Sequence, residues 1–220
     1  MKTVAFIPIK LNNERLPGKN LKAFDNGKPL IEYILNTALQ VKSIDEVYVY
    51  CSNESICNYL PEGVLFKKRD VSLDTDKTKC TDFIKAFRQD VEADIYVLLH
   101  ATAPFVAKDS IERGVLAVKS GDYDSALAVK CHYDFLWRDG KPGNYDVHNV
   151  PRTQDLEPFY TETSGFYIFV KSLVEQNRRI GDRPLLVEVS DIEATDIDEP
   201  IDFEIANAVF NYIVSKKETK

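Results

Sequence analysis

The chain has 220 residues, of which 44% are hydrophobic and 29% charged, and its formal net charge is −7 at pH 7. This is the composition of a globular protein long enough for one well-buried α/β domain. The negative charge argues against general nucleic-acid binding, which needs a basic surface to neutralise phosphates. Basic residues do cluster near the N-terminus, so a small anionic ligand is compatible with the chain.

The cysteines bear on the cellular compartment. They are scattered, with no pair at metal-ligand spacing, and we interpret them as free, mostly buried thiols, which suit a reducing cytosol; they are Cys51, Cys57, Cys80 and Cys131. The apolar run at residues 4–9 is too short for a signal sequence or a membrane span. We therefore expect a cytoplasmic protein with no membrane partner.

Strands and helices alternate along the first part of the chain. Compact apolar runs predict strands covered on both faces at residues 3–9, 46–51, 64–67, 95–99 and 125–130. Apolar residues at helical spacing predict helices at 30–39 after Pro29, from about Glu54, at 81–91 with Thr81 as N-cap, and from Asp109 or Ser110 to Val118. This alternation predicts an α/β fold with a doubly wound, mainly parallel sheet.

The pattern changes at residue 133. Residues 133–158 hold the turn signals Asp139-Gly140 and Pro142-Gly143 and little periodic apolar content. We expect an excursion from the core: a hairpin, a lid or a dimer arm. The sheet resumes at 165–170 and 185–189, and an amphipathic helix at 200–213 closes the chain. No linker divides the sequence, so we expect a single domain over residues 1–220 with the excursion inserted at about 133–158.

The loop after the first predicted strand is the first place to look for a ligand, because open α/β sheets bind ligands at the carboxyl ends of their strands. It lacks the G-x-G-x-x-G pattern of dinucleotide sites and the G-K-[ST] of P-loops. It offers a turn at Pro17-Gly18 and several polar side chains: the cations Lys10, Arg15 and Lys19 and the amides Asn12 and Asn13. Together these suit a triphosphate.

The segment from Ile7 to Leu21 resembles the N-terminal signature of the cytidylyltransferases that make CMP-activated sugar acids. Residues 15–19 (RLPGK) are similar to the CMP-Kdo synthetase branch, whereas 19–21 (KNL) and 27–31 (GKPLI) are similar to the CMP-sialic acid synthetase branch. The resemblance implies a Rossmann-like nucleotidyltransferase fold. It also implies a nucleotide site formed by Ile9, Lys10, Asn12, Asn13, Arg15, Lys19, Asn20, Arg69 and His100.

Three positions depart from the family pattern within this site. Lys10 stands where the family has Arg, which keeps the charge and loses the bidentate fork. Asn13 stands where the family has Ser. His100 replaces the usual Gln, and we weigh two interpretations of it: a neutral hydrogen-bonding His at a strand end, or a catalytic base.

Residues 151–169 (PRTQDLEPFYTETSGFYIF) resemble the family segment R-R-Q-D-L-P-P-x-Y-R-E-N-G-A-x-Y-I-F. In the sialic branch this segment follows the dimerisation arm and lines the sugar-acid pocket. The resemblance therefore implies a homodimer and an acceptor site formed by Arg152, Gln154, Tyr160, Glu162 and Tyr167. Thr161 stands where the family has a basic residue, and residues 163–165 replace N-G-A, so the acceptor stays open.

Residues 195–203 (TDIDEPIDF) resemble the family's D-I-D-x-P-x-D-[FL]. In an extended segment Asp196 and Asp198 point to the same side, an arrangement suited to Mg²⁺. The alternative is that carboxylates here stabilise the start of the next helix, an interpretation we adopt for Glu199 and Asp202.

These patterns lead to one functional hypothesis, transfer of CMP from CTP to a 2-keto-3-deoxy sugar acid of the sialic or nonulosonic type, with release of pyrophosphate. The candidate catalytic residues are Lys10, Arg15, Lys19 and Asp198, and the candidate cofactor is Mg²⁺ on Asp196 and Asp198. The alternatives are a nucleotidyltransferase for another acceptor (Kdo, a sugar phosphate or a phosphonate) and a non-catalytic nucleotide-binding homologue.

Overall fold

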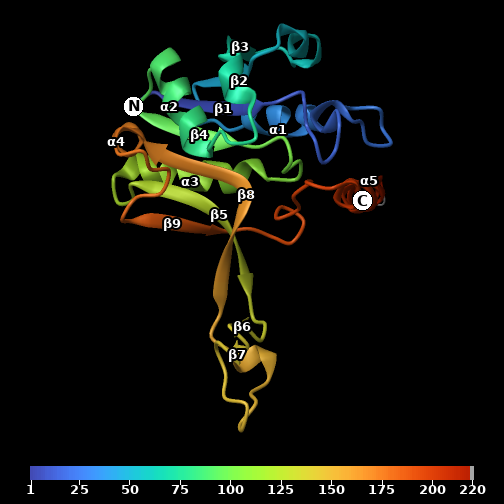
Figure 1. Ribbon diagram of the computed structural model, residues 1–220, viewed down its shortest axis with the longest axis vertical. Coiled ribbons are helices and arrows are strands. Elements are labelled where there is room, and N and C mark those ends of the chain that lie inside the picture. The colour runs from blue at the N-terminus through green and yellow to red at the C-terminus, as the bar shows by residue number, and fades with distance from the viewer. Residues whose placement is uncertain (219–220) are drawn as a thin grey trace.

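The computed structural model describes residues 1–218, and its centre is a seven-stranded sheet in the order β3-β2-β1-β4-β8-β5-β9 (Figure 1). The strands are β1 (Thr3–Ile9), β2 (Glu46–Cys51), β3 (Val64–Lys68), β4 (Ile95–Leu99), β5 (Ser125–His132), β8 (Phe159–Val170) and β9 (Pro184–Glu188). All neighbouring pairs are parallel except those of β8, which runs antiparallel to β4 and to β5. The prediction of a mainly parallel sheet is confirmed.

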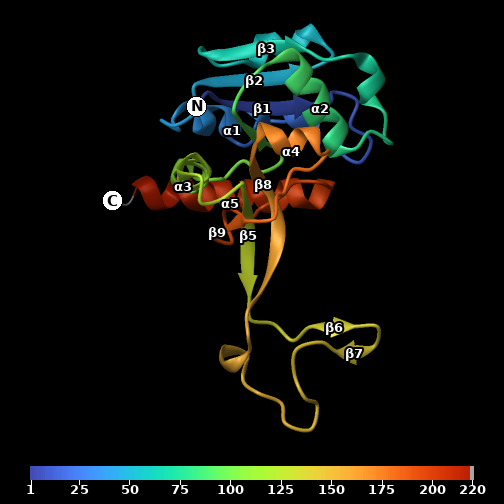
Figure 2. The ribbon, with the colours of Figure 1, turned by 90° about the vertical axis from the view of Figure 1, so that its left-hand side faces the viewer.

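Helices cover both faces of this sheet, which is the doubly wound arrangement predicted from the sequence (Figure 2). One face carries α1 (Leu30–Leu39) and α3 (Lys108–Ser120), and the other carries α2 (Cys80–Asp90) and the short α4 (Lys171–Glu175). The final helix is α5 (Pro200–Glu218), and four 3₁₀ turns complete the list: η1 (Lys19–Leu21), η2 (Glu54–Tyr59), η3 (Val71–Asp74) and η4 (Thr153–Asp155).

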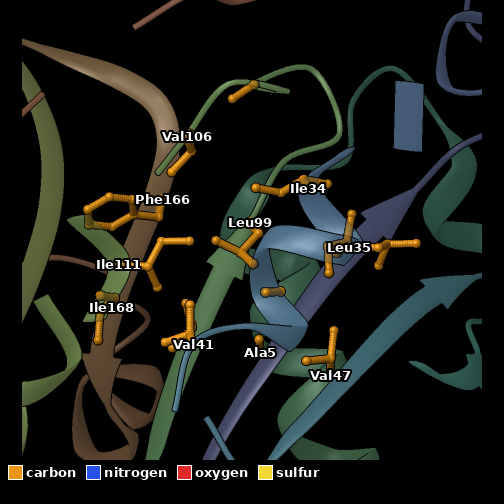
Figure 3. Close-up of a cluster of buried hydrophobic side chains, with 14 of the residues drawn as sticks. Ala5, Ile34, Leu35, Val41, Val47, Leu99, Val106, Ile111, Phe166 and Ile168 are labelled. Carbon is orange, nitrogen blue, oxygen red and sulfur yellow. The ribbon is translucent and has the colours of Figure 1, made fainter. Parts of the chain in front are cut away.

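The core has two apolar layers because successive side chains of a strand point to opposite faces. In β1, Ala5 and Ile7 join the layer beneath α1 and α3, which Figure 3 shows, whereas Phe6 joins the layer beneath α2. The Phe6 ring stacks on that of Phe87 at 4.2 Å between centroids. Each such fully buried side chain contributes about 1.5–3 kcal/mol, and cover on both faces explains why the central strands read as unbroken apolar runs.

The predicted excursion is the most conspicuous departure from this layered body. Strands β5 and β8 continue past the sheet as a two-stranded stalk, and residues 133–158 form an arm beyond it (Figures 1 and 2). The arm holds a small hairpin of β6 (Trp137–Arg138) and β7 (Lys141–Pro142). Its turn is the predicted Asp139-Gly140 pair, whose φ angles of 52° and 72° are those of a tight hairpin turn.

Several predicted boundaries were wrong. Helix α2 begins at Cys80 and Thr81 lies within it, because the Asp82 carboxylate accepts the Lys79 N–H at 2.8 Å and fixes the N-cap two residues earlier. Strand β8 begins at Phe159, six residues before the predicted strand, since the stalk extends its pairing with β5. The short helix predicted from about Glu54 does begin there, as a 3₁₀ helix, whereas α4 was not predicted and α5 extends beyond residue 213.

The cysteines are free, as predicted, but only Cys51 is buried; Cys57 is exposed, and Cys80 and Cys131 are partly exposed. Within residues 1–218, no helix combines the length and the apolar character that crossing a membrane requires.

Candidate active site

The loop after β1 folds back onto the segment that precedes α5, and apolar side chains hold the two together. Leu16 of the loop, Ile197 of the segment and Phe203 of α5 are buried in one small cluster with Phe24. The turn at Gly18 has φ of 69°, a conformation that glycine adopts without strain. This packing places the basic loop against the acidic residues 196–199.

Lys19 makes the central polar contact between loop and segment. Its side chain is only 10% exposed, and its ammonium donates to the Ile197 carbonyl at 2.9 Å and to the Asp198 carboxylate at 3.1 Å. A buried ammonium needs such partners because desolvation of an unpaired charge is costly. Lys19 therefore joins two predicted parts of the site that lie far apart in the sequence.

Arg15 adds a second cation at the same carboxylate. Its guanidinium lies 3.1 Å from Asp198 and 3.5 Å from Glu199, while its side chain remains 60% exposed. Exposed ion pairs of this kind contribute about 0–1 kcal/mol. Arg15 can consequently exchange these partners for a phosphate at little cost, whereas the buried Lys19 cannot move freely.

The basic side of the loop borders an open cleft of about 370 Å³, lined by Lys10, Asn13, Glu14, Arg15, Leu16, Lys19 and Asp76. Asn20 is buried and shapes this rim, since its amide donates to the Lys10 carbonyl at 2.9 Å and lies 3.5 Å from the Asn13 oxygen. The structure thus brings most of the predicted phosphate residues together. Of the others, Asn12 is exposed outside the cleft lining and the Ile9 side chain lies in the core.

Along the acidic segment, exposed and buried side chains alternate, as they do in an extended chain. Ile197 is fully buried and its N–H donates to the Thr102 carbonyl at 3.0 Å, while Asp196 is exposed and Asp198 partly exposed. The two carboxylates therefore emerge on the side away from Ile197. Asp198 contacts two residues of the cleft lining, Arg15 and Lys19. Carboxylates of this kind suit Mg²⁺, which takes one or two of them and completes its shell with substrate phosphates and water.

Asp202 has the helix-capping geometry predicted for it. Its carboxylate accepts the N–H groups of Asp198 at 2.9 Å and Glu199 at 2.7 Å, and these bonds hold its pKa below the usual range. It stabilises the start of α5 and fixes the backbone that carries Asp198.

His100 lies at the carboxyl end of β4 and donates from Nδ1 to the Ser164 carbonyl at 2.6 Å. Burial lowers the pKa of His100, against the opposing influence of that carbonyl and of Asp196. The ring is accordingly neutral, with the proton on Nδ1 and a lone pair on Nε2. Such a ring can accept a hydrogen bond from a hydroxyl group.

Arg69 lies away from the loop cleft, although it was predicted to be part of the nucleotide site. It is 2% exposed, pairs with Asp74, and donates to the Tyr50 carbonyl at 3.4 Å. It lines a second cavity of about 560 Å³ between the ends of β2 and β3 and helix α2, so it is not part of the lining of the loop cleft.

The residues predicted to bind the sugar acid divide into two groups. Glu162 and Tyr167 are in contact, with the Tyr167 hydroxyl donating to the carboxylate at 2.8 Å, and the Tyr167 ring faces His100 at 6.2 Å between centroids. Tyr160 lies on the stalk, and Arg152 and Gln154 lie at the base of the arm, where Arg152 pairs with Asp155 at 2.7 Å.

Sequence reasoning missed one residue of the first group. Arg179, in the loop between α4 and β9, lies 3.2 Å from the Glu162 carboxylate, and its guanidinium covers the Tyr167 ring at 3.8 Å. The only sequence signal was the Arg178-Arg179 pair in a polar loop, which does not show which arginine points inward.

Solved structures establish the fold class to which this arrangement belongs. The chain is similar to CMP:2-keto-3-deoxy-manno-octonic acid synthetase complexed with CTP, with a TM-score of 0.71 and 18% identity over 96% of this chain and 99% of that one. It is also similar to 4-diphosphocytidyl-2C-methyl-D-erythritol synthase from Anaerococcus prevotii, with a TM-score of 0.67 and 12% identity over 96% of each chain. The fold is the predicted Rossmann-like nucleotidyltransferase fold.

The family follows from the sequence. A family model described as cytidylyltransferase matches residues 4–176, and the chain belongs to that family. It is 27% identical to N-acylneuraminate cytidylyltransferase A of Danio rerio over 92% of this chain and 49% of the relative. It is also 27% identical to the Streptococcus agalactiae N-acylneuraminate cytidylyltransferase, over 100% of this chain and 56% of the relative. The chain spans about half the length of these two. CMP-N,N'-diacetyllegionaminic acid synthase of Legionella pneumophila is 28% identical over 93% and 94%.

Proposed function

We propose that the protein is a cytidylyltransferase that activates a 2-keto-3-deoxy sugar acid of the nonulosonic type with CTP, giving a CMP-sugar and pyrophosphate. The contact of Lys19 with Asp198 carries the proposal, because it joins a phosphate-binding loop to a pair of carboxylates suited to a divalent cation. The names of the relatives from Danio rerio, Streptococcus agalactiae and Legionella pneumophila support the nonulosonic class of acceptor.

The cationic residues of the loop bind the triphosphate in this proposal. Lys10 and Arg15 line the cleft and neutralise the outer phosphates, while Lys19 holds Asp198 in place. Asp196 and Asp198 would hold Mg²⁺, which when bound neutralises phosphate charge and lowers the pKa of the attacking hydroxyl. Arg15 then leaves Asp198 for a phosphate oxygen, an exchange that its exposure permits.

The chemistry is a single displacement at phosphorus. The anomeric hydroxyl of the acid forms a bond to the α-phosphorus, the bond from that phosphorus to the bridging oxygen breaks, and pyrophosphate leaves. The hydroxyl proton passes to a base, and the Nε2 lone pair of His100 is available to accept a hydrogen bond from the sugar. Positioning and charge neutralisation supply most of the acceleration in such transfers.

The arm supports a homodimer as part of the proposal. It exposes a group of large apolar side chains, which are Tyr133, Phe135, Trp137, Val147 and Val150. Exposed apolar side chains that gather on one segment are typical of an interaction site. Sedimentation of the wild type and of Trp137→Asp tests it: a dimeric wild type and a monomeric variant are expected, and a monomeric wild type would remove the dimer from the proposal.

Pyrophosphate release tests the activity itself. The protein is incubated with Mg²⁺, each nucleoside triphosphate and a panel of acids that includes N-acetylneuraminic, legionaminic, pseudaminic and Kdo acids. We expect release with CTP and one or more nonulosonic acids, and a loss of about 100-fold in Asp198→Asn. Asp191→Asn is the matched control, since Asp191 is an exposed carboxylate paired with Lys130 at 3.0 Å.

The outcomes separate the candidates. Release with Kdo alone would favour the second candidate, a Kdo-type acceptor, to which the R-L-P-G-K segment at residues 15–19 points. CTP binding without release under any condition would favour a non-catalytic homologue and contradict the proposal.

A further inference from the structure

A sugar acid brings a carboxylate into the acceptor pocket, and this inference rests on the proposed function. A carboxylate that leaves water needs a cation with hydrogen-bond donors, and a guanidinium is the best match because it binds both oxygens. Thr161, which precedes Glu162 in β8, carries no charge. Its hydroxyl lies on the stalk, 2.9 Å from Nε2 of His132. The pocket therefore needs its cation from another part of the chain.

Arg179 supplies a positive charge beside Glu162 and Tyr167, two of the residues predicted to bind the sugar acid. It comes from the α4–β9 loop, and its side chain is 30% exposed, so it is partly desolvated and still reachable. The central carbon of the guanidinium lies over the Tyr167 ring, 3.8 Å from its centroid, and one nitrogen lies 3.2 Å from the Glu162 carboxylate. This cation–π contact holds the guanidinium against the ring, and the N–H groups that do not bind Glu162 can donate to a ligand.

The surroundings of Arg179 connect it to the end of β4. Its charge acts on His100, where it adds to the effect of burial in lowering the pKa of that ring. The rings of Tyr167 and His100 meet edge to face, with their centroids 6.2 Å apart. Arg179, Glu162, Tyr167 and His100 thus form one polar group, with a fixed cation, a carboxylate and a neutral imidazole.

We propose that Arg179 binds the carboxylate of the sugar-acid acceptor and so determines that the enzyme selects acids. Among the described residues, Glu162 is its one ion-pair partner, and that carboxylate is already shared with the Tyr167 hydroxyl. A guanidinium has five N–H donors, so it can keep Glu162 and add the acceptor. Glu162 and the Nε2 of His100 then accept hydrogen bonds from sugar hydroxyls.

Arg178 provides a control within the same loop. It is paired with Asp182 at 2.7 Å and donates to the Ile180 carbonyl at 3.1 Å, so its donors serve the loop itself. Arg178→Met removes a neighbouring charge without touching the acceptor group. Arg179→Met removes the charge and keeps an unbranched side chain over Tyr167, and Arg179→Lys keeps the charge without the fork.

The experiment measures steady-state kinetics with the acid that the wild type uses best and with the carboxamide of that acid. In Arg179→Met we expect the KM for the acid to rise about 10- to 100-fold, because a charge-assisted hydrogen bond is lost. The KM for CTP and the turnover of the carboxamide should stay within about twofold of the wild type. Arg179→Lys should recover part of the loss, and Arg178→Met should behave as the wild type.

The results distinguish this inference from the proposed function. An active wild type whose Arg179→Met variant keeps its preference for acid over carboxamide would overturn the inference alone. Equal rises in the KM for acid, carboxamide and CTP would show a merely structural role and also overturn it. A wild type that releases no pyrophosphate with any acid would overturn the proposed function, and this inference with it.

Discussion

The contact between Lys19 and Asp198 makes a quantitative prediction about stability. We consider the variants Lys19→Met and Asp198→Ala and the double variant, because the cycle of four proteins isolates the energy of the pair from the other effects of each change. Lys19→Met alone also leaves the Ile197 carbonyl without its 2.9 Å donor. We therefore expect this single change to cost about 2–4 kcal/mol of unfolding free energy.

The coupling energy itself should lie between two limits. Exposed ion pairs couple by about 0.2–1 kcal/mol, and hydrogen bonds to charged groups contribute about 1.5–3 kcal/mol. The Lys19 side chain is 10% exposed, which favours the upper range, whereas Asp198 is 42% exposed and shared with Arg15, which reduces it. We expect a coupling of about 1–2 kcal/mol.

Urea unfolding followed by far-ultraviolet circular dichroism measures these energies, provided that the four proteins have equal m-values. The matched control is the pair Lys68 and Glu54, which lie 2.9 Å apart with both side chains 66% exposed. Its coupling should stay below about 0.5 kcal/mol. A Lys19–Asp198 coupling no larger than that of the control would refute the idea that burial makes this contact strong.

The remaining predictions concern pH and loop shape. Burial lowers the pKa of His100, so just below pH 6.5 this side chain takes up a proton more readily in the unfolded chain than in the folded one. The wild type should therefore lose stability relative to His100→Gln between pH 7 and 5, which melting curves measure. The two backbone N–H groups that lower the pKa of Asp202 donate hydrogen bonds to its charged carboxylate. Asp202→Ala should therefore cost about 1 kcal/mol at pH 7 in urea unfolding, and the cost should shrink as the pH falls below about 4; a constant cost would exclude the capping role. Asn20→Ala leaves the Lys10 carbonyl without its donor and should weaken CTP binding about tenfold by calorimetry, whereas unchanged affinity would show that this bond does not shape the site.

The sequence was most informative where burial and chemistry coincide. The strands at the centre of the sheet are apolar on both faces, so their positions could be predicted almost to the residue. The basic loop and the acidic segment could each be recognised from charge and spacing. Their contact through Lys19 and Asp198 depends on the packing of Leu16 and Ile197, which local patterns do not reveal.

The direction of a strand and the contacts between residues distant in the sequence were harder to predict. Strand β8 is as apolar near its end as the parallel strands of the sheet, and nothing in such a run indicates that it pairs antiparallel with both neighbours. Helix α4 has five residues, too few for a recognisable period. Arg179 reaches Tyr167 from a loop whose path is fixed by the bonds of Asp124 to the N–H groups of Asp182 and Arg183, a purely tertiary arrangement.

The bond from Lys19 to Ile197 joins residues that are 178 positions apart. Contacts of such long range are slow to form, because the conformational entropy of closing the intervening chain must be lost before the contact stabilises the fold. During synthesis, a nascent chain that has emerged only as far as β9 carries the basic loop without the segment that anchors Lys19. Only a molecule with its C-terminal region docked offers the complete site. A ligand of that site will therefore stabilise molecules in which the contact between Lys19 and residues 197–198 has formed, in preference to partly folded ones.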